Sequence, residues 1–457
     1  MAADFETMRG SVFTFLFFAS FLHAQDPLPI DPLWKSDAFR KAFTGSYGID
    51  ARIEPKVTTE EKSVLDAVAG ELANGDRAAA IAKLTASSLL EKSPALLFAV
   101  GNLEFEEGKI DEAIGRFDAA LKLYPNFRDA HRNLALALVQ KNETAKAEPH
   151  LTRAIELGAQ DGLTLGLLGY VHANAGRGQA ALQAYRLAQL TMPSEPQWKL
   201  GEAHALLSLD EPKAAASIFG EILEQRPDDA GIWMNQADAF SKLDQPENAI
   251  ANLELVRRLG KLGPAETISL GHLFLNESLP EAALVCYEGA ISAGKPAPLA
   301  KALDALEYLA LFRRWEEAEL IASKISGSES YSGPLGETQN RSRFDRARAL
   351  LELERGNAEA GAKLVEAILE RDPLDALAQI LLAQFRVREG KVEEGILLLE
   401  QAATQPEHEA EVLRIHGQIL VNRGDFKEAV ELLERVLELE PEDAGLREYV
   451  EAVRDLQ

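Results

Sequence analysis

The chain has 457 residues, of which 46% are hydrophobic and 26% charged, an ordinary balance for a folded protein with a sizeable core. Acidic side chains outnumber basic ones by 73 to 48, and the formal net charge of −25 repels the phosphates of nucleic acids and anionic lipids. We therefore expect no nucleic-acid partner; the charge favours basic partners, or serves solubility alone. The single cysteine, Cys286, excludes an intramolecular disulfide and a CxxC redox pair.

The N-terminus has the pattern of a secretory signal peptide. Arg9 precedes an uncharged apolar run that is too short to span a bilayer, and Ala24 is followed by the polar stretch QDPLP. The pattern predicts export with cleavage after Ala24, so that residues 1–24 are removed. An uncleaved anchor is the alternative. The acidic residues before Arg9 fit a signal peptide poorly, and translation from Met8 is a further hypothesis.

Residues 25–58 form an N-terminal extension with no repeated pattern. They contain PLWKSDAFRKAF, in which Trp34, Phe39 and Phe43 have spacings compatible with one short amphipathic helix. Two interpretations are open. The helix caps the regular part of the chain that follows, or it docks into this protein's own groove or a partner's.

A 34-residue pattern then repeats to the end of the chain, with a jump of 44 residues at one point. Repeats start at Glu60, Pro94, Arg128, Gly162, Pro196, Ala230, Pro264, Pro298, Ser342, Ala376 and Ala410, and a half-unit starts at Ala444. The eighth residue of all eleven repeats is Gly or Ala, namely Ala67, Gly101, Ala135, Gly169, Ala203, Ala237, Gly271, Ala305, Ala349, Ala383 and Gly417. Two short antiparallel helices nest closely where the crossing point carries no side chain larger than a methyl group.

Two further positions support helical hairpins. Large residues recur at position 24 and are expected to fill the space between units, as in Phe117, Tyr185, Phe219 and Tyr287. Prolines recur at position 32, where they end the second helix: Pro125, Pro193, Pro227, Pro373 and Pro441. At Ala159, Lys261, Lys295 and Glu407 another residue replaces that proline.

At these residues the chain resembles the tetratricopeptide repeat family, from Glu60 to Gln457. The resemblance implies an all-α, right-handed superhelical solenoid of helix–turn–helix repeats, because one hairpin cannot bury its apolar face alone. We expect an N-terminal array over 59–325 and a C-terminal array over 342–443. The Gly-, Ser- and Pro-rich residues 326–341 between them are expected to be a loop insertion or hinge. The half-unit 444–457, with Glu451 at position eight, is expected to be a capping helix.

The sequence carries no convincing enzymatic motif. GRGQAA, from Gly176 to Ala181, matches a dinucleotide-binding pattern, but it lies between two repeat helices where that motif needs a preceding strand. Walker, HExxH and GxSxG motifs are missing. We expect no enzyme and no catalytic, cofactor-binding or metal-binding residues. Cys286 is expected to be a small buried hydrophobe rather than a reactive thiol.

In this family the first helix of each repeat lines a concave groove through positions 2, 5, 9, 12 and 13. The resemblance assigns that role to a nearly neutral set, the predicted stripe: Phe98, Asn102, Phe105, Arg132, Tyr170, Asn174, Gln197, His204, Met234, Asp238, His272 and Asn276. Such a stripe suits an extended peptide or a partner helix; the alternative is that its residues pack against one another. His204 and His272 are interpreted as polar lining rather than metal ligands.

A basic lane follows in the C-terminal array, formed by Arg343, Arg346, Arg388 and Arg414. It would receive an acidic group or a C-terminal carboxylate, unless Glu354 and Glu411 neutralise it.

Family members that bind C-terminal carboxylates use a clamp of Lys and Asn residues on three consecutive repeats. Asn102 and Asn133 match its Asn positions, but Phe98 stands where a Lys belongs. Leu163 and Gly166 occupy the basic positions of the third repeat. The resemblance therefore argues against recognition of that kind.

Together these observations predict a non-catalytic scaffold that binds a protein or peptide in its groove and needs no cofactor. We expect it to be exported, to the periplasm of a Gram-negative bacterium or beyond the cell. One alternative is a structural component whose arrays assemble end to end, against which the polar cap argues. Another is an accessory subunit of an envelope enzyme or secretion complex.

Overall fold

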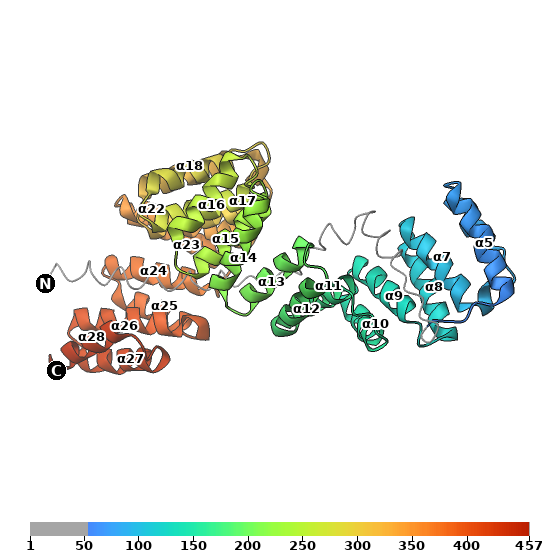
Figure 1. Cartoon of the computed structure of the whole chain (residues 1–457). Coiled ribbons are helices and arrows are strands. Elements are labelled where there is room, and N and C mark those ends of the chain that lie inside the picture. Colours follow the sequence, from blue (N-terminus) through green and yellow to red (C-terminus); the bar gives the residue numbers. More distant parts are fainter. Residues whose placement is uncertain (1–53, 457) are drawn as a thin grey trace. The chain divides into compact units, whose positions relative to one another are not determined.

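The protein was analysed as a computed structural model that describes residues 54–456 (Figure 1). The predicted signal peptide and the aromatic segment around Trp34 lie outside the described residues. Within them, secondary structure is helical and no strand occurs. The α-helices are α5 (Thr59–Ala73), α6 (Arg77–Thr85), α7 (Pro94–Glu106), α8 (Ile110–Leu123), α9 (Arg128–Gln140), α10 (Thr144–Glu156), α11 (Gly162–Asn174), α12 (Gly178–Thr191), α13 (Pro196–Ser208), α14 (Pro212–Gln225), α15 (Ala230–Lys242), α16 (Pro246–Arg258), α17 (Pro264–Asn276), α18 (Pro280–Ile291), α19 (Leu299–Leu311), α20 (Trp315–Gly327), α21 (Glu329–Ser332), α22 (Thr338–Glu354), α23 (Ala358–Arg371), α24 (Ala376–Arg388), α25 (Val392–Ala402), α26 (Glu409–Arg423), α27 (Phe426–Leu439) and α28 (Ala444–Arg454).

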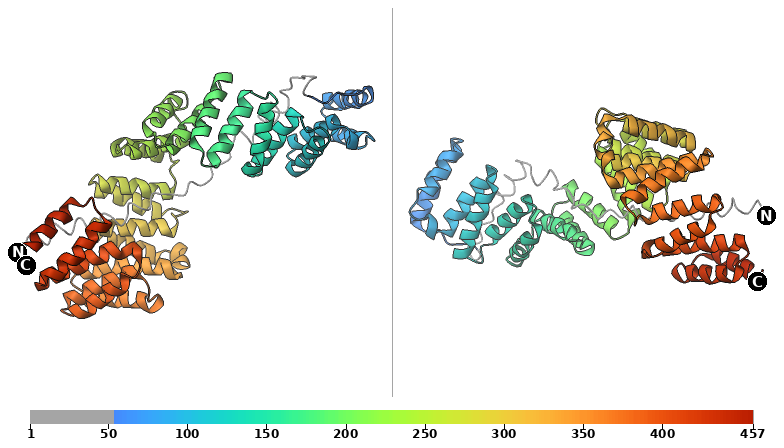
Figure 2. Two further views of the ribbon diagram at one scale, coloured as in Figure 1. Left: turned by 90° about the horizontal axis from the view of Figure 1, so that it is seen from below. Right: turned by 180° about the vertical axis from the view of Figure 1, so that it is seen from behind.

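The helices form successive hairpins, and the predicted all-α solenoid is confirmed. Eight predicted repeat starts are the first residue of a helix, at Pro94, Arg128, Gly162, Pro196, Ala230, Pro264, Ala376 and Ala444. Three others, in α5, α19 and α26, differ by one residue. Within the N-terminal unit, for example, α8 packs on α7 and α9, and α12 packs on α11 and α13 (Figure 2).

The closing prolines determine where second helices end. In α8, α12, α14, α23 and α27 the helix stops two residues before the proline. The residue between, for example Tyr124 before Pro125, has φ −138° and ψ 87°, which is outside the helical region. Proline imposes this backbone because its ring clashes with a preceding helical residue. Where Ala159 replaces the proline, Gly158 ends α10 instead, with a φ of 100°.

Close nesting at position eight is confirmed in the repeats that carry glycine there. A Cβ added to Gly271 would lie 2.4 Å from Cε1 of Tyr287, and one added to Gly101 would lie 2.7 Å from Cε1 of Phe117. Positions eight and 24 of the same hairpin therefore contact each other, the small residue admitting the large one. The first repeat is an exception: Ala67 is exposed, because position 24 there is Lys83 rather than a large apolar residue.

The chain divides into two compact units within α16, and each is described separately. The N-terminal unit, described over 54–252, has one continuous hydrophobic core that runs from Val68 to Ile232. The C-terminal unit, 253–456, contains four core clusters; the largest lies between α17 and α22, and the last lies between α26 and α28.

Residues 326–341 are not the loop that their composition predicted. α20 runs to Gly327, α21 follows, and α22 begins at Thr338, four residues before the expected repeat start. Tyr331 and Leu335 are buried in the core of the C-terminal unit, and the Tyr331 hydroxyl donates a hydrogen bond to the Ala297 carbonyl oxygen at 2.8 Å. The extra residues are ordered because these two apolar side chains attach them to the core.

The last helix covers the end of the core. In α28, Leu446, Val450 and Val453 are buried in a cluster that contains Leu433 of α27, while Glu451 is exposed. One face of α28 is thus apolar and the other polar, as expected of a terminal capping element.

Candidate interaction surface

Much of the predicted stripe is buried in the first three hairpins after α6. Phe98, Asn102 and Phe105 on α7, with Arg132 on α9 and Tyr170 on α11, are 1% to 8% exposed. The Phe98 ring lies 4.6 Å from the Phe127 ring between centroids. These side chains therefore offer little surface to a partner. Their burial favours the alternative in which the stripe residues pack within the protein.

The two asparagines at the clamp positions hold each other. Asn133 Nδ2 donates a hydrogen bond to Asn102 Oδ1 at 2.7 Å, and both residues are buried. This pair links α7 to α9. The structure therefore gives these amides a role between helices.

Arg132 contacts the start of the next repeat. Its Nε donates to Thr164 Oγ1 at 3.0 Å, and its guanidinium lies 3.3 Å from Asp161 Oδ1. Asp161 is the N-cap of α11 and accepts hydrogen bonds from the backbone N–H groups of Leu163 and Thr164. Arg132 thus connects α9 to the N-terminus of α11 and is 4% exposed.

Two stripe residues on α11 and α13 keep an unsatisfied acceptor. Asn174 donates from Nδ2 to the Tyr170 carbonyl oxygen at 3.0 Å, but no described group donates a hydrogen bond to its buried Oδ1. The same holds for Oε1 of Gln197, in the first turn of α13, among residues 54–456. An unpaired buried acceptor costs about 1–3 kcal/mol, so each oxygen is suited to an N–H donor from a ligand or water.

The stripe becomes accessible at α13 and α15. His204 is half-buried, with its ring edge-on to Phe219 at 5.7 Å, and burial lowers its pKa to about 4. Met234 is half-buried, and Asp238 is exposed with its carboxylate 3.9 Å from Lys242 Nζ. These residues give the N-terminal unit a polar and soft apolar surface in two adjacent hairpins.

In the C-terminal unit His272 is a core residue. Its Nδ1 lies 2.8 Å from the Tyr287 hydroxyl, and its ring centroid lies 4.0 Å from that of Tyr308. Burial lowers the pKa of His272 to about 4, so the ring is neutral near pH 7. Asn276, at the end of the same helix, is exposed. The stripe thus offers Asn276, but not His272, to a partner here.

The first two arginines of the basic lane, Arg343 and Arg346, form hydrogen bonds with carboxylates. Arg343 donates to Glu307 Oε1 at 2.9 Å and to Asp304 Oδ1 at 2.8 Å, and Arg346 donates to Asp375 Oδ2 at 2.7 Å. These hydrogen bonds occupy the guanidinium groups that a ligand carboxylate would need.

The last two arginines of the lane differ from each other. Arg414 lies 2.8 Å from Asp443 and 2.5 Å from Glu440. Arg388 is exposed at the end of α24.

The neutralising residues are not those expected from the sequence. Glu354 lies 3.9 Å from Arg313, and Glu411 lies 4.0 Å from His408 and has its pKa raised to about 7 by burial. Neither pairs with Arg343, Arg346 or Arg414. Arg346 and Arg414 pair instead with Asp375 and Asp443, which cap the first helix of the next unit, and Arg414 also pairs with Glu440.

One arginine–aspartate spacing recurs along the chain. The Arg stands at position five of a repeat and the Asp caps the first helix of the next repeat, 29 residues later, as in Arg132–Asp161, Arg346–Asp375 and Arg414–Asp443. The same positions that the family resemblance assigned to the groove therefore carry contacts between hairpins.

Two histidines form a contact that the sequence did not predict. His131 and His150, on α9 and α10, have their Nδ1 atoms 2.9 Å apart, and His131 Nε2 lies 2.9 Å from the Pro125 carbonyl oxygen. A carbonyl only accepts hydrogen bonds, so His131 donates from Nε2 and accepts from His150 at Nδ1. Burial lowers the pKa of both rings. The sequence signal was position four, where Trp233 likewise donates to the Pro227 carbonyl oxygen.

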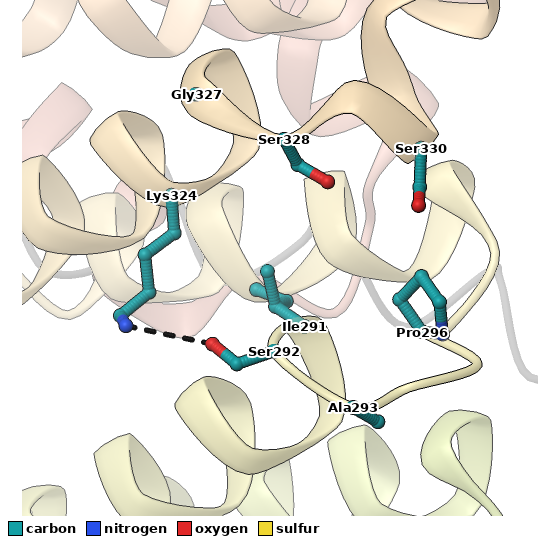
Figure 3. Close-up of a pocket in the computed structure, with 8 residues that line it drawn as sticks. All are labelled: Ile291, Ser292, Ala293, Pro296, Lys324, Gly327, Ser328 and Ser330. Carbon is teal, nitrogen blue, oxygen red and sulfur yellow. Dashed lines mark hydrogen bonds between the residues drawn. The ribbon is translucent and has the colours of Figure 1, made fainter.

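A shallow hollow of about 310 Å³ opens beside the insertion (Figure 3). It is lined by Ile291, Ser292, Ala293, Pro296, Lys324, Gly327, Ser328 and Ser330. Lys324 is the only cation among them, and its Nζ lies 3.5 Å from Ser292 Oγ and 3.3 Å from Glu288. Its charge is thus already compensated, and the hollow is not organised to hold an anion.

Residues 54–456 contain neither a metal site nor a membrane-spanning helix. No group of three or more His, Cys, Asp or Glu side chains is arranged there to hold a metal ion. Within the same residues, no helix combines the length and apolarity needed to cross a bilayer. Cys286 is buried, and burial raises the pKa of its thiol to about 11, which disfavours the nucleophilic thiolate.

Comparison with known sequences agrees with the hairpin geometry. Sequence profiles of the tetratricopeptide repeat match residues 98–162, 200–264, 346–410 and 411–443. The chain belongs to the tetratricopeptide repeat family. It is a protein-interaction scaffold of the kind these repeats build, and proteins of this family are typically not catalytic. No curated protein matches it.

Several solved structures are similar in fold. A tetratricopeptide repeat protein from Parabacteroides merdae is 19% identical, with a TM-score of 0.37, over 55% of this chain and 98% of that one. MamA, residues 41 to the end, from Desulfovibrio magneticus is 23% identical, with a TM-score of 0.35, over 38% and 99%. YrrB, described as a tetratricopeptide repeat protein with an unusual peptide-binding site, is 20% identical, with a TM-score of 0.34, over 36% and 84%.

Proposed function

We propose that the protein is an exported, non-catalytic adaptor. It holds an extended peptide or a helix of a partner protein against α11, α13 and α15, which are the first helices of three consecutive hairpins. The observation that carries this proposal is the pair of unsatisfied acceptors, Asn174 Oδ1 and Gln197 Oε1. A peptide backbone supplies N–H donors, and pairing them with buried acceptors removes a cost of about 1–3 kcal/mol for each.

The neighbouring side chains support the same occupant. Met234 is a flexible, polarisable contact for apolar side chains, and Asp238 is an exposed carboxylate that favours a basic residue in the partner. The chain's net charge of −25 favours the same sign of partner. The C-terminal lane is a weaker candidate, because Arg343, Arg346 and Arg414 already pair with carboxylates.

A photoreactive amino acid at Met234, introduced in the native host, tests the proposal. We expect one discrete adduct, whose partner mass spectrometry identifies. The control places the same group at Leu190 of α12, which is 80% exposed and is not part of the stripe. Equal labelling from both positions, or self-adducts alone from Met234, would reject the stripe as the binding surface.

Export is part of the proposal and has its own test. The signal-like N-terminus supports export to the periplasm of a Gram-negative bacterium or beyond the cell. The protein recovered from that compartment should lack Met1–Ala24 by intact mass. A full-length mass would indicate an uncleaved anchor instead.

A further inference from the structure

Glu411, the third residue of α26, has a buried carboxylate oxygen without a hydrogen-bond partner. No described group donates a hydrogen bond to its Oε2. Among the described residues only His408 lies within ion-pair distance: its Nδ1 is 4.0 Å from this oxygen and is also buried and without a partner. At 4.0 Å the two atoms are not hydrogen-bonded. A negative charge on this carboxylate is therefore costly, because burial removes water and no described donor replaces it.

The charged groups around α26 do not compensate this carboxylate. The elements α25, α27 and η4 (Pro406–His408) pack against the helix. The cations on these elements are Lys427, Arg435 and, when protonated, His408; Arg435 already pairs with Glu409. α25 and η4 carry the carboxylates Glu393, Glu394, Glu400 and Glu407, and α27 carries Glu428, Glu431, Glu434 and Glu438. On α26 itself, Arg414 and Arg423 pair with carboxylates other than Glu411.

The N-terminus of α26 lacks the side-chain cap of the neighbouring first helices. Asp375 and Asp443 cap α24 and α28 through their side-chain oxygens. The N-cap of α26 is His408, whose side chain makes no such hydrogen bond. Instead, the backbone N–H of Glu409 donates to the Pro406 carbonyl oxygen in the turn η4. An ionised carboxylate near such a helix start is stabilised when it accepts a backbone N–H.

Glu61 shows this alternative arrangement at the same helical position. It is the third residue of α5, is 9% exposed, and accepts the backbone N–H of the N-cap residue, Thr58, at 2.6 Å. Burial acts to raise the pKa of Glu61, but hydrogen bonds from Ser93 and Thr58 lower it. A buried glutamate in this position is therefore held in its ionised form when it joins a capping box.

The two N-cap residues also differ in backbone conformation. Thr58 is extended, with φ −75° and ψ 168°, whereas His408 has φ −113° and ψ 1°. The ψ angle of His408 sets the direction of the Glu409 N–H. The extended conformation that an N-cap in a capping box adopts would turn this N–H away from the Pro406 carbonyl oxygen. Capping by Glu411 and the present turn η4 therefore exclude each other.

We propose that one proton on Glu411 decides between two arrangements of the junction of η4 and α26. With the proton, the neutral carboxyl stays in its buried position, and the His408 backbone N–H donates to the Gln405 carbonyl oxygen at 3.0 Å, as in the structure. Without the proton, the carboxylate accepts that N–H, His408 becomes extended, and the hydrogen bond from Glu409 to Pro406 is lost. Because Glu411 stands at position two of its repeat, a position that the family resemblance assigns to the groove, the same proton changes the charge there.

The direction of the pH dependence follows from the pKa of this carboxyl in each arrangement. Burial raises the pKa of Glu411 to about 7 in the described arrangement, above its usual value of 4.5. In a capping box the pKa is expected to lie below the usual value, as it does for Glu61. The described arrangement thus binds the proton more tightly and is favoured in acid. It loses this advantage as the pH rises from about 4.5 to about 7.

Hydrogen exchange of the full chain, resolved to single amides, tests this switch at about pH 5.5 and about pH 8. After correction for intrinsic rates, protection of the Glu409 amide should fall about tenfold at the higher pH. Protection of the His408 amide should change less than about threefold, because one acceptor replaces another. Protection of α24 should not change. Unchanged protection of Glu409, loss at both amides, or an equal loss in α24 would overturn the proposal.

Three substitutions identify the group that titrates. Glu411→Gln keeps the shape of the side chain without a charge and should abolish the pH dependence. Glu407→Gln removes an exposed neighbouring carboxylate, and His408→Gln removes the imidazole; both variants should keep the pH dependence. A pH dependence that persists in Glu411→Gln, or that disappears in either control, would overturn the proposal. The parent and His408→Gln suffice for this decision if Glu411→Gln does not fold.

Discussion

Arg346 and Asp375, 29 positions apart, join two consecutive hairpins. The Arg346 guanidinium donates to one Asp375 oxygen at 2.7 Å, and the other oxygen accepts the Ala378 backbone N–H at 2.9 Å. One carboxylate thereby caps α24 and fastens it to α22. Since both side chains are largely buried, at 20% and 14% exposure, the pair is shielded from the solvent that weakens surface ion pairs.

A double-mutant cycle should measure this link. Arg346→Met removes the charge, and Asp375→Ser keeps a capping oxygen while removing the carboxylate. We expect a coupling of about 1 kcal/mol in the free energy of opening α22–α24, measured by hydrogen exchange. The control pair Lys363 and Glu359 is exposed to solvent, which screens the two charges, and its coupling should be much weaker than that of Arg346 and Asp375. Equal coupling in the two cycles would show that the pair does not join the hairpins.

Close nesting at position eight predicts opposite effects for two glycines of one hairpin. Gly271→Ala places a Cβ 2.4 Å from the Tyr287 ring and should destabilise α17–α18 by about 2 kcal/mol. Gly289→Ala, on α18, meets nothing within 4 Å and should stabilise the hairpin by about 0.5–1 kcal/mol. Local hydrogen exchange measures both. Similar effects of the two substitutions would contradict the nesting geometry.

Acid should weaken the C-terminal unit through His272. Its pKa in the folded chain is about 4, below the usual value of about 6.5, so the neutral ring stabilises folding above pH 6.5. This contribution to the free energy of unfolding disappears as the pH falls from 6.5 to 4. At pH 5 the free energy of unfolding should be about 2 kcal/mol lower than at pH 7 because of His272.

Denaturant titrations at pH 7 and pH 5, followed by circular dichroism, measure the effect. His272→Gln should reduce the acid-induced loss by a similar amount, whatever its effect at pH 7. An identical loss in variant and parent would show that His272 does not titrate in this window.

The turn inside each repeat has one left-handed residue, and its identity should affect stability. Ser278 has φ 60° where the equivalent Gly176 has φ 70°. A side chain is strained in this region by about 1–2 kcal/mol, so Ser278→Gly should stabilise α17–α18 by about 1 kcal/mol. Gly176→Ala should destabilise its own hairpin by a similar amount. Melting curves and local exchange would show the gain, and a loss at Ser278→Gly would disprove the strain argument.

The repeat register was readable from the sequence because its determinants are local. Pro125 ends α8 through its own ring, and Gly271 admits Tyr287 within one hairpin. Each depends on residues at most 16 positions apart that recur with the same spacing. The structure of residues 326–341 could not be predicted in this way, because it does not depend on a local pattern. Their Gly, Ser and Pro composition indicates a loop, whereas the burial of Tyr331 and Leu335 depends on the helices packed around them.

The candidate site also has features that the sequence determines and features that depend on tertiary contacts. The sequence by itself determined which helices carry the stripe and that its residues are mostly uncharged, since the period places them on one side of each first helix. Only the tertiary structure decided that Phe98 and Tyr170 are buried while Met234 and Asp238 are accessible. It also decided that Arg346 and Arg414 bind the carboxylates that cap the first helix of the next unit. Accessibility and charge pairing are properties of neighbours across hairpins, and no pattern within one repeat specifies which neighbour will be there.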